Sequence, residues 1–152
     1  MKRKAPLLLM EQMVMLLVFA LAAALCLQAF VKSDSLSQHS EERDRAMTLC
    51  QTAAETIRAC RGGEGVIPAL GKAAEKLGYG INDGVLYQEF DEDWNPVDYG
   101  VYRLDAEGVS TRVPGLKAVR VTVMKGFNVG QEMEVLFDIE ISWQGEVSGH
   151  AG

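Results

Sequence analysis

The stretch Leu7–Val31, LLLMEQMVMLLVFALAAALCLQAFV, decides the architecture of this chain of 152 residues. Its strongly polar side chains are Glu11, Gln12 and Gln28, and the part from Met13 to Leu27 has no polar face. As an α-helix the stretch would be about 37 Å long, which exceeds the roughly 30 Å of a bilayer's hydrocarbon core. A soluble core helix would keep a polar face. Residues 7–31 therefore predict a transmembrane helix.

The charges beside this helix predict its orientation. Residues 1–6 form a basic leader containing Lys2, Arg3 and Lys4, whereas acidic residues follow soon after the far end. Because basic flanks stay in the cytoplasm, we expect a single-pass protein of the bacterial membrane with its N-terminus inside and its C-terminal domain outside. Removing the leader's three bases and Glu11 from the chain's 15 Lys and Arg and 21 Asp and Glu leaves a net charge of −8. Such acidity argues against binding to nucleic acid.

A cleavable secretory signal is the alternative for the same helix. Ala22, Ala23 and Ala24 would offer small residues to a signal peptidase. However, the apolar run continues past Cys26, and the bulky Leu25 precedes that cysteine where a lipoprotein site needs a small residue. We therefore expect a retained anchor.

Residues 32–62 predict an amphipathic continuation of the helix. The segment from Lys32 to Ser40 is polar, which allows a bend or an exposed stretch there. An apolar stripe follows at helical spacing: Ala46, Met47, Leu49, Cys50, Ala53, Ala54, Ile57 and Cys60. Arg61 before Gly62 and Gly63 predicts the helix end. Cys50 and Cys60 would lie about 15 Å apart along the axis, too far for a disulfide, so both are expected to be small buried residues.

Residues 63–143 predict a small α+β domain. A short helix fits Pro68–Leu77 with Gly78 as its stop. Alternation then predicts a four-stranded antiparallel sheet with strands at Val85–Phe90, Tyr99–Leu104, Leu116–Met124 and Gln131–Trp143. In the last strand the inward residues are expected to be Met133, Val135, Phe137, Ile139, Ile141 and Trp143, with Leu136 as the exception. The helical stripe would cover the apolar face of the sheet, and residues 144–152 would form a flexible tail.

Few residues suggest catalysis, metal binding or phosphate binding. His39 and His150 have no partner at metal-ligand spacing, Ser110 and Ser142 have no neighbouring base, and no glycine-rich phosphate loop follows a strand. We therefore expect no enzymatic activity, no catalytic residue, no cofactor and no small-molecule substrate.

The acidic loop Asp91–Pro96 allows two interpretations. Asp91, Asp93 and Asn95 alternate like the first ligands of a calcium-binding loop. Pro96 then replaces the required glycine, and Tyr102 replaces the bidentate glutamate. A turn between strands, with Trp94 packed down, is the favoured interpretation, and calcium binding stays open.

Glu11 is a stronger indication of function than the acidic loop. A carboxylate at the centre of a membrane helix costs about 2.5–3.5 kcal/mol and usually has a partner. Glu11 lies about 6 Å inside the apolar boundary, so it could also reach the headgroups or Lys4. The residue is therefore either functional or tolerated.

The order of these parts resembles that of type IV pilins and type II secretion pseudopilins. The resemblance is carried by the basic leader, by Leu7-Leu8-Leu9-Met10-Glu11 with its long apolar helix, and by the small antiparallel sheet. The segment Leu86–Val97 also looks like strand-turn segments of pilin-like proteins. The resemblance implies a mature chain that starts at Leu7, with Glu11 as its fifth residue and its assembly contact. Pro6 stands where the family has glycine, so cleavage and polymerisation are not implied.

Two functions follow as expectations. The first is a pilin-like minor subunit of a type IV pilus or a type II secretion-type envelope assembly. It would pack through its N-terminal helix against other pilin-like subunits or assembly platform proteins, and Glu11 would accept a partner's amine. The second is a signal-anchored extracytoplasmic binding or sensing domain that does not assemble. The sequence names no cargo or ligand for either.

Overall fold

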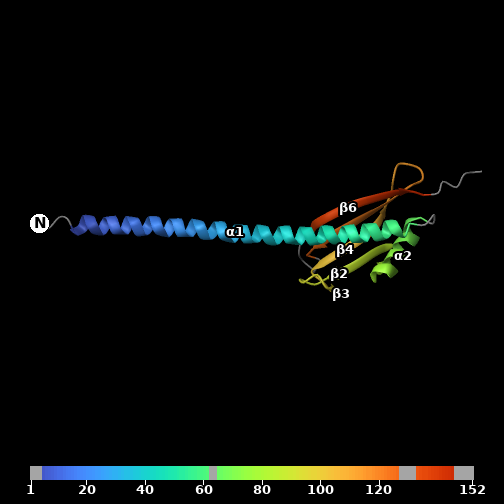
Figure 1. Ribbon diagram of the computed structural model, residues 1–152, viewed down its shortest axis with the longest axis horizontal. Coiled ribbons are helices and arrows are strands. Elements are labelled where there is room, and N and C mark those ends of the chain that lie inside the picture. Colours follow the sequence, from blue (N-terminus) through green and yellow to red (C-terminus); the bar gives the residue numbers. More distant parts are fainter. Residues whose placement is uncertain (1–4, 62–64, 127–132, 146–152) are drawn as a thin grey trace, which may run out of the picture. The chain divides into compact units, whose positions relative to one another are not determined.

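The computed structural model describes residues 5–61, 65–126 and 133–145. The predicted α+β class is confirmed, since a long N-terminal helix is followed by a short helix and an antiparallel sheet (Figure 1). The contacts divide the chain into two compact units, Met1–Glu41 and Glu42–Gly152. The side chains of the leader 1–6, and residues 146–152 of the predicted tail with His150, lie outside the described residues, whereas Gln144, predicted to begin the tail, is the last residue of the final strand.

Helix α1 runs from Ala5 to Ala59 without interruption. The segment Lys32–Ser40 is exposed and helical, and it contains no break. Side chains support it locally, because the Ser35 hydroxyl donates to the Lys32 carbonyl at 3.0 Å and the Gln38 amide donates to Asp34 at 3.4 Å. Gly62 and Gly63, the predicted stop of the helix, lie outside the described residues.

Helix α2 (Val66–Leu77) ends as predicted at Gly78. Gly78 has a left-handed backbone with φ 73°, and its N–H donates to the Ala74 carbonyl. Glycine adopts this conformation without the steric cost that a Cβ would impose. The buried side of α2, Ala69, Leu70, Ala73 and Ala74, packs into the core.

The sheet has six strands and not the four that were predicted. In chain order they are β1 (Gly80–Asn82), β2 (Val85–Phe90), β3 (Pro96–Val97), β4 (Tyr102–Val109), β5 (Leu116–Lys125) and β6 (Glu134–Gln144). The spatial order is β1-β2-β4-β5-β6, and β3 pairs with β2. All described pairings are antiparallel.

The two missed strands, β1 and β3, lie in segments for which no strand was predicted. β1 joins β2 through Asp83 and Gly84, whose φ values of 49° and 79° are those of a tight hairpin turn. β3 returns after the turn at Asp91 and pairs with the last two residues of β2. Strands of two or three residues are too short to show alternation, which explains why the sequence pattern did not reveal them.

The predicted strand from Tyr99 to Leu104 was placed too early. β4 begins at Tyr102, and Tyr99 is 94% exposed in the preceding turn. The backbone at Gly100 crosses close to Phe90, and the Val101 N–H donates to the Phe90 carbonyl at 2.9 Å. The chain therefore turns before it can join the ladder.

The inward residues of β6 were predicted in part. Ile141 and Trp143 are buried as expected, but Met133 and Val135 are exposed and Leu136 is buried. The register shifts between Val123 and Met124, which pair with Phe137 and Val135, so Leu136 is the extra residue of a β-bulge. The bulge moves Val135 to the opposite face and turns Leu136 inward.

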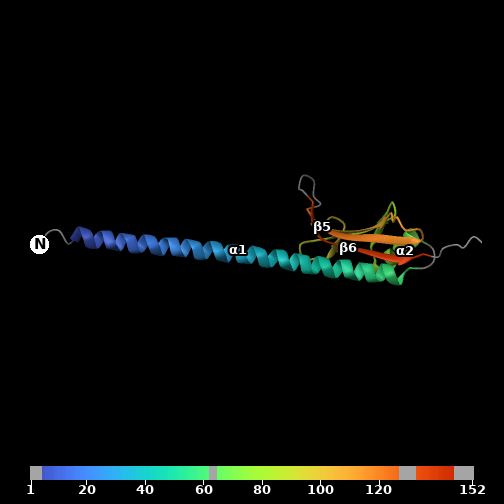
Figure 2. The ribbon, with the colours of Figure 1, turned by 90° about the horizontal axis from the view of Figure 1, so that it is seen from above.

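The core lies between the sheet and the C-terminal part of α1, together with α2. From α1 it takes Ala46, Cys50, Ala53, Ala54 and Ile57, and from the sheet it takes residues such as Leu86, Leu104, Val121 and Val123. The green end of α1 runs along one side of β5 and β6 (Figure 2). The predicted stripe thus packs on the apolar face of the sheet, except for Met47, which is exposed.

Candidate functional site

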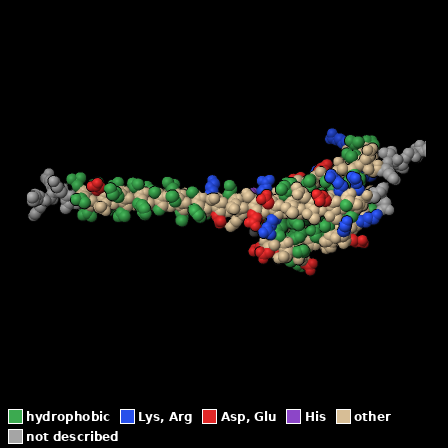
Figure 3. All heavy atoms as spheres, in the orientation of Figure 1, with side chains coloured by type: hydrophobic (Ala, Val, Ile, Leu, Met, Phe, Trp, Pro, Cys, Tyr) green, Lys and Arg blue, Asp and Glu red, His purple; other side chains and the backbone are tan. Residues whose placement is uncertain are grey.

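The first candidate site is the apolar stretch of α1. Every residue from Leu7 to Val31 is exposed, and hydrophobic side chains follow one another along the helix (Figure 3). Among the described residues, α1 is the one helix long and apolar enough to cross a membrane. Exposed apolar surface of this extent is too costly to leave in water. The stretch is therefore a candidate membrane anchor or signal sequence.

Glu11 is exposed on this stretch. On a helix, the neighbours of residue 11 are residues three and four positions away: Leu7, Leu8, Val14 and Met15. The carboxylate is thus the one acidic group in the apolar surface between Leu7 and Val31. An acid placed in this way requires a partner, or access to water or headgroups, once the helix lies in lipid.

The acidic loop after β2 is a tightly bonded turn. The Asp91 carboxylate accepts hydrogen bonds from the backbone N–H groups of Asp93 at 2.9 Å and Asn95 at 2.8 Å, and from the Asn95 side-chain amide. These bonds, first that from the Asn95 backbone, hold the pKa of Asp91 below its usual range. Within the described residues, no group of three or more His, Cys, Asp or Glu is arranged to hold a metal. The contacts support the turn interpretation.

Trp94 packs down from this turn, as predicted. Its ring stacks on that of Tyr102 with 4.0 Å between centroids and an 11° angle between planes, and it also contacts Phe90. The backbone of Trp94 is left-handed, with a φ of 65°. The turn is therefore anchored to the core through an aromatic cluster.

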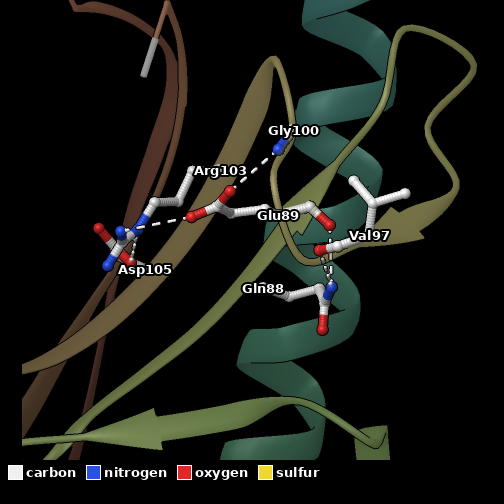
Figure 4. A network of polar contacts seen from close by, with 6 residues as sticks. All are labelled: Gln88, Glu89, Val97, Gly100, Arg103 and Asp105. Carbon is white, nitrogen blue, oxygen red and sulfur yellow. Dashed lines mark hydrogen bonds and ion pairs between the residues drawn. The ribbon is translucent and has the colours of Figure 1, made fainter. Parts of the chain in front are cut away.

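A buried carboxylate holds the next turn, and the sequence pattern did not identify it. Glu89 accepts the Gly100 N–H at 2.9 Å and lies 3.7 Å from the Arg103 guanidinium, which also bonds Asp105 at 2.8 Å (Figure 4). The Gln88 amide donates to the carbonyls of Glu89 and Val97. No local signal marks this network, because Glu89 and Gly100 are separated by 11 positions.

A second unpredicted cluster fixes the start of the sheet-packed part of α1. The Glu42 carboxylate accepts hydrogen bonds from the Tyr102 hydroxyl at 2.9 Å and from the Lys125 ammonium at 2.6 Å. Burial, followed by the bond to Glu42 and its charge, raises the pKa of Tyr102. In the sequence, Glu42 is only one of several polar residues on this helix. Charge-assisted bonds of this kind are among the stronger ones in proteins.

A polar groove of about 400 Å³ lies on the open face of the sheet. Its lining includes Asp83, Tyr87, Arg103, Asp105 and Thr122. Arg103 stacks over the Tyr87 ring at 5.2 Å and pairs with Asp105, so its charge is satisfied within the domain. The groove therefore does not by itself define a ligand.

The remaining candidates from the sequence lie apart. His39 is exposed on α1, and Ser110 and Ser142 are exposed at separate places in the domain. All three cysteines are free: Cys26 is exposed, Cys60 is half-buried, and Cys50 is buried with its thiol 3.8 Å from the Val121 carbonyl. Burial, and secondarily the charge of Asp138, raises the pKa of Cys50 to about 12.

We expect Cys50 to resist alkylation in the folded protein, because a buried neutral thiol is a poor nucleophile. Iodoacetamide at pH 8 should modify the half-buried Cys60 while Cys50 stays unmodified until urea is added, as measured by peptide mass spectrometry. Because the folded protein disfavours the Cys50 thiolate, the unfolding free energy should fall as the pH rises from 9.0, the usual thiol pKa, toward about 12. Equal alkylation rates at the two cysteines without urea would contradict the expectation.

No family model, curated protein or solved structure matches this chain.

Proposed function

We propose that this protein is a pilin-like minor subunit of a bacterial type IV pilus or type II secretion-type envelope assembly. It is anchored by α1 as a single-pass membrane protein, with its N-terminus in the cytoplasm and the sheet domain outside. One observation carries the proposal: the same continuous helix bears an exposed apolar stretch with a single acid, and then a buried stripe covered by an antiparallel sheet.

The physical role assigned to Glu11 is recognition within the bilayer. Lipid tails are as apolar as leucine, so close packing and polar contacts, rather than the hydrophobic effect, drive association between membrane helices. A carboxylate at this depth gains by meeting a cationic group on a neighbouring helix. The partners would be other pilin-like subunits or an assembly platform protein, and Glu11 would accept a bond from a partner's amine.

We expect Glu11→Leu to abolish association with the assembly while leaving membrane insertion intact. Insertion should become easier, by less than the roughly 2.5–3.5 kcal/mol that a carboxylate costs at the helix centre, because Glu11 lies near the end of the apolar stretch. Co-purification of the tagged protein with pilin-like subunits and the platform protein, extracted in mild detergent from its own bacterium, measures the effect.

Gln12→Leu is the matched control, because it changes the adjacent polar residue, which lies about 100° around the helix from Glu11. It should retain the partners. Unchanged co-purification of Glu11→Leu would remove the assembly role and leave a signal-anchored binding or sensing domain that does not assemble.

The intact mass of the membrane-extracted protein decides between anchor and signal. We expect the mass of the full chain. Loss of residues 1–6 would restore the complete pilin mechanism, with Leu7 as a new N-terminus. A chain that starts after Cys26 would instead show that the helix is a secretory signal and would overturn the proposal.

A further inference from the structure

The two edges of the sheet differ in the length of the strands that form them. One edge is formed by β1 and β3, which have three and two residues and both pair with β2. At the opposite edge lies β6, an 11-residue strand that pairs with β5. Within residues 5–61, 65–126 and 133–145, no strand pairs with the other side of β6. An uncovered strand of this length is a template for pairing with another chain.

The register identifies the backbone groups on this outer edge. The Gly145 N–H donates to the Gly115 carbonyl at 2.8 Å, one step beyond the pair of Leu116 and Gln144. Bonded and non-bonded pairs alternate in an antiparallel ladder. The odd-numbered residues from Phe137 to Trp143 therefore bond to β5. The N–H and C=O groups that point outward belong to Asp138, Glu140, Ser142 and Gln144.

The side chains along this edge give the site its chemistry. β6 contains three acids, Glu134, Asp138 and Glu140, and no Lys or Arg. The side chains of Asp138 and Glu140 are exposed, and Glu140 pairs with Arg120 at 3.3 Å. The neighbouring Phe137 and Ile139 pack against the core but are only half-buried. The edge thus offers acids on one face and incompletely covered apolar groups on the other.

We propose that the outer edge of β6 docks an extended segment of a partner protein in which Lys or Arg alternates with apolar residues. The segment would add a strand to the sheet through main-chain hydrogen bonds. Its bases would lie opposite Asp138 and Glu140, and its apolar residues would cover Phe137 and Ile139. The bulge at Leu136 marks one end of the site, because it interrupts regular pairing.

Pairing with a second copy of this chain is disfavoured in the register centred on Ile139. Antiparallel pairing of two β6 strands centred on Ile139 would place Asp138 of one copy against Glu140 of the other, and like charges directly opposite are destabilising. The proposed docking is separate from assembly through α1, and it stands or falls independently of Glu11.

The test uses the full chain in nanodiscs of zwitterionic lipid, so that a basic peptide does not bind the bilayer. The probe is the synthetic peptide Lys-Val-Lys-Val-Lys-Val-Lys with blocked ends, and the control is Lys-Lys-Lys-Lys-Val-Val-Val, which cannot alternate. We expect the alternating peptide to bind at least about tenfold more tightly, and to slow amide exchange at Asp138, Glu140 and Ser142 by a similar factor.

Ser142→Pro removes one outward N–H without removing a bond to β5, since edge strands tolerate proline on their free side. It should weaken binding of the alternating peptide by about tenfold or more, whereas Ser142→Ala should change the affinity for this peptide by less than about twofold. The pair Asp138→Lys and Glu140→Lys should reverse the preference, so that Glu-Val-Glu-Val-Glu-Val-Glu binds instead. This reversal does not depend on whether the proline variant folds.

Three results would overturn the proposal. The first is equal binding of the alternating and block peptides. The second is slow exchange of the Asp138, Glu140 and Ser142 amides without peptide, which would mean that the chain covers its own edge. The third is a concentration-dependent dimer that protects these same amides.

Discussion

Replacing Gly100 by alanine should strongly lower the free energy of unfolding of the sheet domain. A Cβ at Gly100 would lie 2.2 Å from the Phe90 carbonyl oxygen and 2.6 Å from the Phe90 nitrogen. Both are backbone atoms of a paired strand, so they cannot rotate away. The turn must therefore shift, which breaks the bond from the Gly100 N–H to Glu89. The combined cost is roughly 3–4 kcal/mol of unfolding free energy.

Urea unfolding of the full chain in detergent micelles measures this loss. Trp94 and Trp143 are the two tryptophans of the chain, and both lie in the unit Glu42–Gly152, so their fluorescence reports that unit. Gly71→Ala is the matched control, because Gly71 lies inside α2 and a Cβ there meets nothing within 4 Å. It should raise stability by up to about 1 kcal/mol. Equal effects of the two substitutions would contradict the close approach at Gly100.

Ile57→Ala should cost about 3 kcal/mol, because it removes buried side-chain atoms and leaves a cavity. Ile57 is fully buried in α1 and packs with the residues of the sheet. The substitution therefore tests whether the second part of α1 belongs to the folded domain. The same unfolding experiment measures it, with a shift of the urea midpoint at an unchanged slope.

Ile67→Ala makes the same chemical change at a residue in α2 that is 66% exposed. It should alter the unfolding free energy by less than about 0.5 kcal/mol. If Ile57→Ala were equally mild, the last turns of α1 would not contribute to the core, and the helix could be separated from the sheet.

The features that local periodicity encodes could be predicted from the sequence. Three of these features depend only on residues that are close in the sequence. They are the apolar run from Leu7, the stripe through Cys50 and Ile57, and the helix end at Gly78. The strand Val85–Phe90 was predicted with its observed bounds. In these segments the chain's own spacing determines which face is buried.

What could not be predicted depends on contacts between distant segments. Glu42 reaches Tyr102 across 60 positions and Lys125 across 83. The bulge at Leu136 forms because β5 and β6 stay paired on both sides of it. Its one sign in the sequence is that the apolar Leu136 breaks the alternation of the strand. Strands β1 and β3 form because β2 offers an edge, and no pattern of two or three residues shows that.

The turn at Tyr99 has a consequence for protease resistance. The Tyr99 side chain is fully accessible to a protease that cleaves after aromatic residues. The bond that it must hydrolyse joins Tyr99 to Gly100, whose N–H is held by Glu89, and the next N–H is held by the Phe90 carbonyl. A protease needs several residues of loose, extended chain, so the accessible ring lies on a backbone that cannot enter its cleft. Digestion at this position would thus follow opening of the domain and not precede it.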